Sequence, residues 1–199
     1  YLTTARNFIN FKFVTFDQIS VTNGFQPLWF LIILVLKFFV NNEIIFNCFI
    51  ISLIFIFSFL TFFNFRNYLK KQNYTETSSI FISVSISFLS LFFSKNGMEI
   101  SLAIFLFSRS LIYLNNNNIL FCIFAFLTFL SRLEFILFYF VIFFYELFIA
   151  KKIFQKKYIF QILILPILLI FYMVFNHFYF ESFLPESGIA KSLNNHLQF

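Results

Sequence analysis

The run IIFNCFIISLIFIFSFLTFFNF, residues 44–65, decides the fold class of this chain. It contains no charged side chain, and it is long enough to cross the hydrocarbon core of a bilayer, which takes a helix of about 20 mostly apolar residues. The 199 residues of the chain are 61% hydrophobic and 11% charged, whereas soluble domains are about 45–50% apolar and 25% charged. The sequence therefore predicts an all-α fold, a polytopic transmembrane helical bundle. It excludes a cytosolic enzyme, a disulfide-stapled secreted domain and a disordered tail.

Apolar runs separated by short polar segments fill most of the chain. About six of them lie within residues 44–175, and each predicts a helix. The apolar run at 27–40 is too short to cross a bilayer, so we expect a re-entrant or interfacial helix there, opened by Pro27. Residues 1–26 are mixed and polar, and we expect an exposed segment with one short helix. After residues 44–65, the apolar runs are 79–94, 100–114, 120–130, 135–149 and 158–175.

This order predicts a single membrane-embedded domain over residues 1–199. In it, residues 1–43 form a first outer loop that includes the interfacial helix, and residues 176–199 form a second outer loop. The run at 79–94 is short and rich in serine, so we expect it to pack against protein as well as lipid.

The basic segments predict the orientation of the chain. Residues 66–71 and 151–157 carry half of the 14 Lys and Arg residues, and such basic segments collect on the cytoplasmic side of membrane proteins. An even number of apolar runs separates the two segments, so both can face the cytoplasm of a multi-pass protein in the inner or plasma membrane. The remaining short loops, at 95–101 and 131–134, then share the outer face with the two end segments.

Three ionisable residues on that outer face are candidates for chemistry. Glu99 follows Gly97 at an expected helix start, where a carboxylate is also simply favoured by the helix dipole. Arg132 and Glu134 lie where two apolar runs meet, and ionisable groups near membrane depth usually pair or line a polar cavity. Residues at i and i+2 do not face each other on a helix, so we expect separate partners, or a bend that exposes both. The functional and the structural interpretation both stay open.

No cofactor motif is present. Cys48 and Cys122 lie inside apolar runs, and His177 and His196 have no second ligand at a metal-binding spacing. The chain has no phosphate-binding loop, dinucleotide fingerprint or nucleophile elbow. The net charge of +6 is explained by topology. We therefore predict no cofactor and no nucleic-acid partner, and leave a divalent metal open.

Five short segments, taken in order, resemble a known family. YLTTARNF at 1–8 and TNGFQPLW at 22–29 look like the first outer loop of the GT-C superfamily of integral-membrane glycosyltransferases. The bacterial branch with aminoarabinose, arabinofuranosyl and protein mannosyl transferases is the most similar. SKNGMEIS at 94–101 resembles the acidic second outer loop, and FLSRLEFILF at 129–138 resembles the Arg-containing segment between two short helices. YFESFLPESGIAKS at 179–192 is similar to the loop with Leu-Pro, a turn and a Lys.

The resemblance implies a glycosyltransferase that moves a sugar from a polyprenyl-phosphate donor to a glycan, lipid or protein acceptor at the outer face of the bilayer. Glu99 would be the catalytic acidic residue, and Lys191 and Arg132 would meet the phosphate of the carrier. Gln26, which stands where the family often has His or Lys, and Glu134 are the other substrate- or phosphate-binding candidates.

In this family an acidic pair, Asp-Asp or Asp-Glu, precedes the first outer loop. We therefore expect the chain to be an internal or N-terminally truncated piece, with such a pair encoded before Tyr1. Two other classes remain open: a polytopic transporter or flippase, and a structural subunit of a membrane complex. Transporters favour repeated halves and Gly- or Pro-broken helices, whereas this chain has three Gly, three Pro and no visible repeat.

Overall fold

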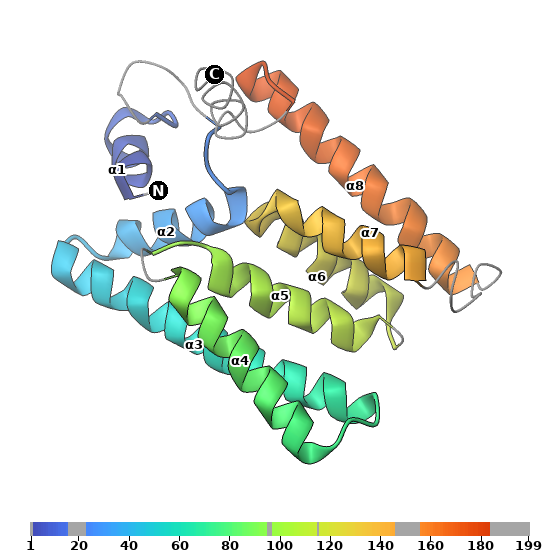
Figure 1. Cartoon of the computed structure of the whole chain (residues 1–199). Coiled ribbons are helices and arrows are strands. Elements are labelled where there is room, and N and C mark those ends of the chain that lie inside the picture. Colours follow the sequence, from blue (N-terminus) through green and yellow to red (C-terminus); the bar gives the residue numbers. More distant parts are fainter. Residues whose placement is uncertain (1, 16–22, 95–96, 115, 146–155, 184–199) are drawn as a thin grey trace, which may run out of the picture. The chain divides into compact units, whose positions relative to one another are not determined.

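The computed structural model describes residues 2–15, 23–94, 97–114, 116–145 and 156–183. Over these ranges the regular structure is helical throughout, without a strand (Figure 1), which confirms the predicted all-α class. The elements are α1 Leu2–Phe11, α2 Pro27–Phe39, α3 Glu43–Lys71, α4 Glu76–Ser94, α5 Ile100–Tyr113, α6 Asn118–Ser131, the 3₁₀ turn η1 Leu133–Phe135, α7 Ile136–Phe144 and α8 Lys156–Phe180.

Each predicted apolar run corresponds to a helix, but α3 and α8 extend furthest beyond their runs. The basic segment 66–71 is the C-terminal end of α3, so its prediction as a loop is wrong. Helix continues there because cations are favoured at a helix C-terminus and because Phe65 and Leu69 stay buried. At the other end of the chain, α8 continues to Phe180, past the predicted end at about residue 175.

The chain divides into two compact units. One comprises residues 1–46 and 168–199, and the other comprises residues 47–167. The membrane-embedded single domain predicted over 1–199 stays a prediction, and each unit is described by itself.

In the first unit, α1 packs against α2. The ring of Phe8 meets Phe30 edge-on, with 6.2 Å between the ring centroids, and Phe25 lies 4.6 Å from Phe30 by the same measure. Asn23 Nδ2 donates a hydrogen bond of 2.8 Å to Ser182 Oγ. The expected exposed segment 1–26 does contain the expected short helix, but its exposure is wrong at several positions. Those buried positions are Thr4, Ala5, Asn7, Thr15 and Asn23.

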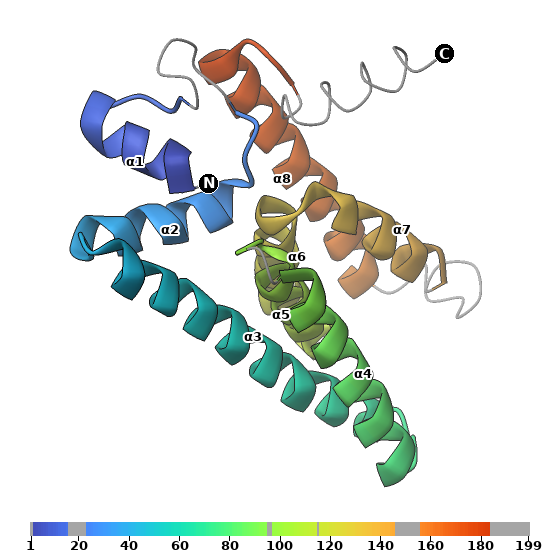
Figure 2. The ribbon, with the colours of Figure 1, turned by 60° about the vertical axis from the view of Figure 1, so that its left-hand side comes forward.

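In the second unit, successive helices run in alternating directions, as Figures 1 and 2 show. The hairpin of α5 and α6 makes the most extensive contact, and α4 packs on α5. Asn117 begins the hairpin's second helix, because its side-chain oxygen accepts the amide of Leu120 at 3.1 Å and so caps α6.

The buried face of α4 is polar and that of α3 is mixed, whereas the exposed faces of both helices are largely apolar. Ser90 Oγ donates to Ser58 Oγ at 2.7 Å, and Asn64 Nδ2 on α3 donates to Ser108 Oγ on α5 at 2.9 Å. All of the buried residues on α4 are serines, which confirms that this serine-rich helix packs against protein. Large side chains such as Phe81 lie on the exposed face. The buried serines are Ser79, Ser83, Ser90 and Ser94.

A second polar contact lies in the aromatic core formed by α5, α6 and α7. Tyr139 is 1% exposed, and the rings of Phe107, Phe121 and Phe129 surround it edge-on. Its hydroxyl donates to Ser110 Oγ at 2.7 Å and lies 3.3 Å from Thr128 Oγ1. The core of this unit is therefore aromatic, with hydrogen-bonded hydroxyl groups at its centre.

Candidate functional site

The junction between α6 and η1 positions Arg132. Helix α6 ends at Ser131, and Arg132 adopts an extended conformation with φ −158° and ψ 116°. From the sequence we expected a bend here that exposes both residues, and the observed bend exposes Glu134 but leaves the Arg132 side chain only 23% exposed. The bend also brings Arg132 and Glu134 together, with Nε to Oε2 and Nη2 to Oε1 both at 3.3 Å. The expectation that these two residues do not pair is wrong, because the i, i+2 rule applies on a helix and Arg132 is not helical.

Glu99 approaches the same guanidinium from the start of α5. It follows Gly97, whose φ of +73° is a conformation that glycine adopts without strain. The side chain of Glu99 is 2% exposed, and its Oε1 lies 3.5 Å from Nε of Arg132. Its Oε2 is buried and has no hydrogen-bond partner. Arg132 therefore faces two carboxylates, one buried and one exposed.

Ser94 explains why the Glu99 carboxylate is not used to cap α5. Glu99 occupies the N-cap position without a side-chain capping bond. The hydroxyl of Ser94, at the end of α4, instead accepts the amide of Ser101 at 2.8 Å. One of the unpaired amides at the start of α5 is thereby satisfied from another helix, which leaves Glu99 to face Arg132. Sequence reasoning missed Ser94, because a cap supplied from seven residues upstream has no local signature.

The chemically informative feature of this site is Oε2 of Glu99, which is buried and has no hydrogen-bond partner. Burying a carboxylate costs free energy unless it is paired and hydrogen-bonded, and Arg132 provides only the pairing. Buried polar groups are nearly always hydrogen-bonded, so an orphan acceptor in a folded protein calls for an explanation. Oε2 can accept a hydrogen bond, or a proton, from a hydroxyl group that enters the site. Ser101 Oγ is likewise buried without a partner.

The other predicted site residues do not join this cluster. Gln26 lies in the first unit, immediately before α2, with its Oε1 buried and without a hydrogen-bond partner. Lys191 lies outside the described residues. The structure therefore brings together Glu99, Arg132 and Glu134, three of the five predicted site residues.

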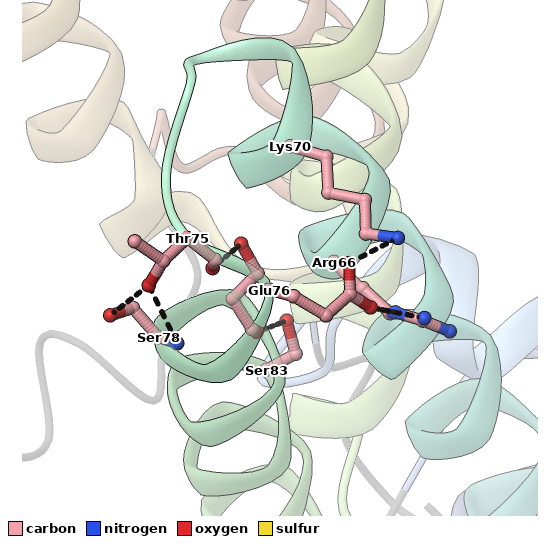
Figure 3. Close-up of polar contacts among 7 residues, drawn as sticks. Arg66, Lys70, Thr75, Glu76, Ser78 and Ser83 are labelled. Carbon is pink, nitrogen blue, oxygen red and sulfur yellow. Dashed lines mark hydrogen bonds and ion pairs between the residues drawn. The ribbon is translucent and has the colours of Figure 1, made fainter.

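A second ion cluster lies at the opposite end of α3 and α4, shown in Figure 3. Glu76 accepts hydrogen bonds from Arg66 and pairs with Lys70 Nζ at 2.5 Å. Lys70 first and Arg66 second hold the pKa of the Glu76 carboxyl below its ordinary value. Thr75 Oγ1 accepts the amide of Ser78 at 3.3 Å and caps α4. These groups are exposed, and their contacts close the α3–α4 hairpin.

The part of the chain that the structure describes contains no cluster of metal-binding side chains. No group of three or more His, Cys, Asp or Glu side chains is placed to hold an ion there. Cys48 and Cys122 are both free thiols. The ring of His177 stacks on Phe183 with centroids 4.3 Å apart.

No family model matches the chain, and neither the curated proteins nor the solved structures contain a match.

Proposed function

We propose that this chain belongs to an integral-membrane glycosyltransferase of the GT-C kind. It would transfer a sugar from a polyprenyl-phosphate donor to a glycan, lipid or protein acceptor at the outer face of the bilayer. The observation that carries the proposal is the buried Glu99 carboxylate, which faces Arg132 through one oxygen and leaves the other oxygen without a hydrogen-bond partner. This arrangement offers an acceptor for a hydroxyl proton next to a cation suited to phosphate.

The distribution of apolar surface supports a membrane location. Helices α3 and α4 are long and apolar enough to cross a bilayer. In the most apolar 18-residue stretch of each helix, only 28% of α3 and 22% of α4 is buried. Small hydroxyl residues face the protein and phenylalanines face outward on α4. Membrane helices favour that arrangement, since lipid solvates the apolar face and small residues allow close packing. In water the same outward face would be costly.

The distribution of charge supports a bilayer between the two ion clusters. In the second unit, the Glu99–Arg132–Glu134 cluster lies where α4 and α6 end and where α5 and the η1–α7 segment begin. The Arg66–Lys70–Glu76 cluster joins the opposite end of α3 to the start of α4. Residues 47–65 of α3 and 77–94 of α4 contain no charged residue. A lipid-linked donor would keep its chain in that apolar zone and present its phosphate to Arg132.

The chemistry assigned to each residue follows from its surroundings. Glu99 Oε2 would accept the proton of the acceptor hydroxyl while the hydroxyl oxygen attacks the sugar. This role is general-base catalysis. Arg132 would stabilise the negative charge that develops on the departing carrier phosphate. Guanidinium suits this task because it presents a fork of donors that matches phosphate oxygens.

The direct test replaces Glu99 in the full-length protein, reconstituted in vesicles with a polyprenyl-phosphate sugar. Glu99→Gln keeps the volume of the side chain and removes the base, so transfer should fall by about 10²-fold or more. The matched control is Glu43→Gln, because Glu43 is an exposed carboxylate at the start of α3. Melting temperature should change little in either variant. Near-normal transfer by a folded Glu99→Gln protein would overturn the assignment.

A second test uses the coding sequence. Codons for Asp-Asp or Asp-Glu directly before Tyr1 would support the transferase, as the resemblance of residues 1–8 and 22–29 predicts. An apolar or basic stretch at that place would count against it.

A further inference from the structure

The guanidinium of Arg132 contacts Glu134 in the way in which an arginine binds a phosphate. Its Nε donates to Oε2 and its Nη2 donates to Oε1, both at 3.3 Å. Carboxylate and phosphate groups both bind the guanidinium fork through two parallel hydrogen bonds. Such charge-assisted bonds are about 2.7–2.9 Å when tight, so the contact with Glu134 is a long one. Glu134 therefore occupies the edge of Arg132 that could bind a phosphate, and it does so through long hydrogen bonds.

The two carboxylates at Arg132 differ in how easily they can leave. The side chain of Glu134 is 59% exposed, whereas that of Glu99 is 2% exposed. An exposed carboxylate that turns away from its partner regains water, and exposed ion pairs contribute little to stability. A buried carboxylate that loses its cation is left uncompensated in a medium of low dielectric constant. An entering anion should therefore displace Glu134 and leave the Glu99 contact in place.

We propose that the Glu134 carboxylate occupies the donor-phosphate site on Arg132 and is displaced when the phosphate binds. This inference rests on the proposed function. The carrier phosphate takes up the guanidinium edge by exchange with the Glu134 carboxylate. The exchange sets the affinity for the donor, because every phosphate that binds must compete with a side chain already in place. Glu134 accordingly lowers the affinity of this site for phosphate, and it takes no part in the proton transfer assigned to Glu99.

The test measures binding of a prenyl monophosphate to the full-length protein in detergent micelles. Glu134→Gln weakens the competitor and keeps its volume, so the dissociation constant should fall by roughly tenfold, the effect of removing one charged hydrogen-bonding partner. Arg132→Gln should raise the dissociation constant by a similar factor or more. Glu43→Gln, at an exposed carboxylate of the other unit, should leave it unchanged.

The double variant separates exchange from general repulsion. If Glu134 competes for the guanidinium, Glu134→Gln should have no effect in a protein that already carries Arg132→Gln. If Glu134 merely repels anions, its removal should tighten binding by the same factor with or without Arg132. That additive result would overturn the proposal, as would equal affinity of the Glu134→Gln and wild-type proteins.

Inorganic phosphate is the second probe, and it separates the proposal from the proposed function. Tightening of both probes by Glu134→Gln, with prenyl phosphate bound more strongly, supports exchange at a lipid-linked donor site. If Glu134→Gln tightens the binding of inorganic phosphate alone, the result supports exchange but contradicts a polyprenyl-phosphate donor. Binding of prenyl phosphate that depends on Arg132 but not on Glu134 overturns the exchange and leaves the transferase proposal intact. No binding of either probe to the wild-type protein overturns both.

Discussion

At the residue scale, the hydroxyl of Tyr139 is a polar group placed at the centre of an aromatic core. It donates to Ser110 Oγ at 2.7 Å. Ser110 and Thr128 each donate their own hydrogens to a backbone carbonyl one turn earlier, so both keep a partner without the tyrosine. The hydrogen bond should therefore contribute modestly to stability, while the ring contributes through packing against Phe121 and Phe129.

Substitution of Tyr139 tests this division. Tyr139→Phe should lower the free energy of unfolding by about 0.5–1.5 kcal/mol, the net value of one hydrogen bond. Tyr139→Ala removes the ring and leaves a cavity, and should cost about 3–5 kcal/mol. Denaturant titration of the protein in detergent micelles measures both. Equal losses for the two variants would contradict the packing argument and assign the stability to the hydroxyl network.

At the element scale, the α3–α4 hairpin is closed by one carboxylate and two cations. Glu76 is the first residue of α4 and precedes the apolar stretch that begins at Ser79, and Lys70 and Arg66 lie near the end of α3. The cations favour the ionised carboxylate, so its pKa is lowered and Glu76 stays charged to a lower pH than an isolated glutamate.

The titration of Glu76 should report its pairing with both cations. The midpoint, followed by NMR of a ¹³C-labelled carboxyl group, should lie below the ordinary value of about 4.3. Lys70→Gln and Arg66→Gln should each raise the midpoint, because hydrogen bonds from both cations lower the pKa of Glu76. High salt should move the wild-type midpoint toward the ordinary value, since exposed pairs are screened. A midpoint unaffected by either substitution would contradict the pairing.

At the scale of the whole molecule, the membrane proposal predicts on which side each loop lies. Helix α3 has 29 residues, so it is about 43 Å long and exceeds the roughly 30 Å of a hydrocarbon core. Asn42 precedes this helix and Asn73 follows it, and both side chains are exposed. Asn23, although also in a predicted outer loop, is 3% exposed and is a poor position for labelling.

Cysteine labelling in intact cells tests that topology. In a background that carries Cys48→Ser, a cysteine introduced at Asn42 should react with an impermeant reagent. A cysteine at Asn73 should react only after the membrane is permeabilised, because the basic end of α3 is predicted to be cytoplasmic. Reaction at Asn73 and protection at Asn42 would reverse the orientation and move Glu99 to the cytoplasmic face. Reaction at both positions in intact cells would contradict a crossing by α3.

Local sequence patterns were sufficient to predict the helices but not the contacts within the candidate site. The apolar runs predicted the helices, because a helix is stabilised by the residues within it and by the apolar surface that it offers. The pairing of Arg132 with Glu134 was missed, because it depends on an extended backbone at a helix junction. The role of Ser94 was missed for a similar reason, since the amide that it accepts belongs to the next helix.

The sequence by itself determined that the described chain is helical, and it placed Glu99, Arg132 and Glu134 among five candidate site residues. These properties follow from composition and spacing, which act over a few neighbouring residues. Only the tertiary structure decided that Arg132 is shared by two carboxylates, and that Glu99 is buried with one oxygen lacking a hydrogen-bond partner. Both facts require the start of α5 to meet the end of α6, and the packing of α5 against α6 sets that contact.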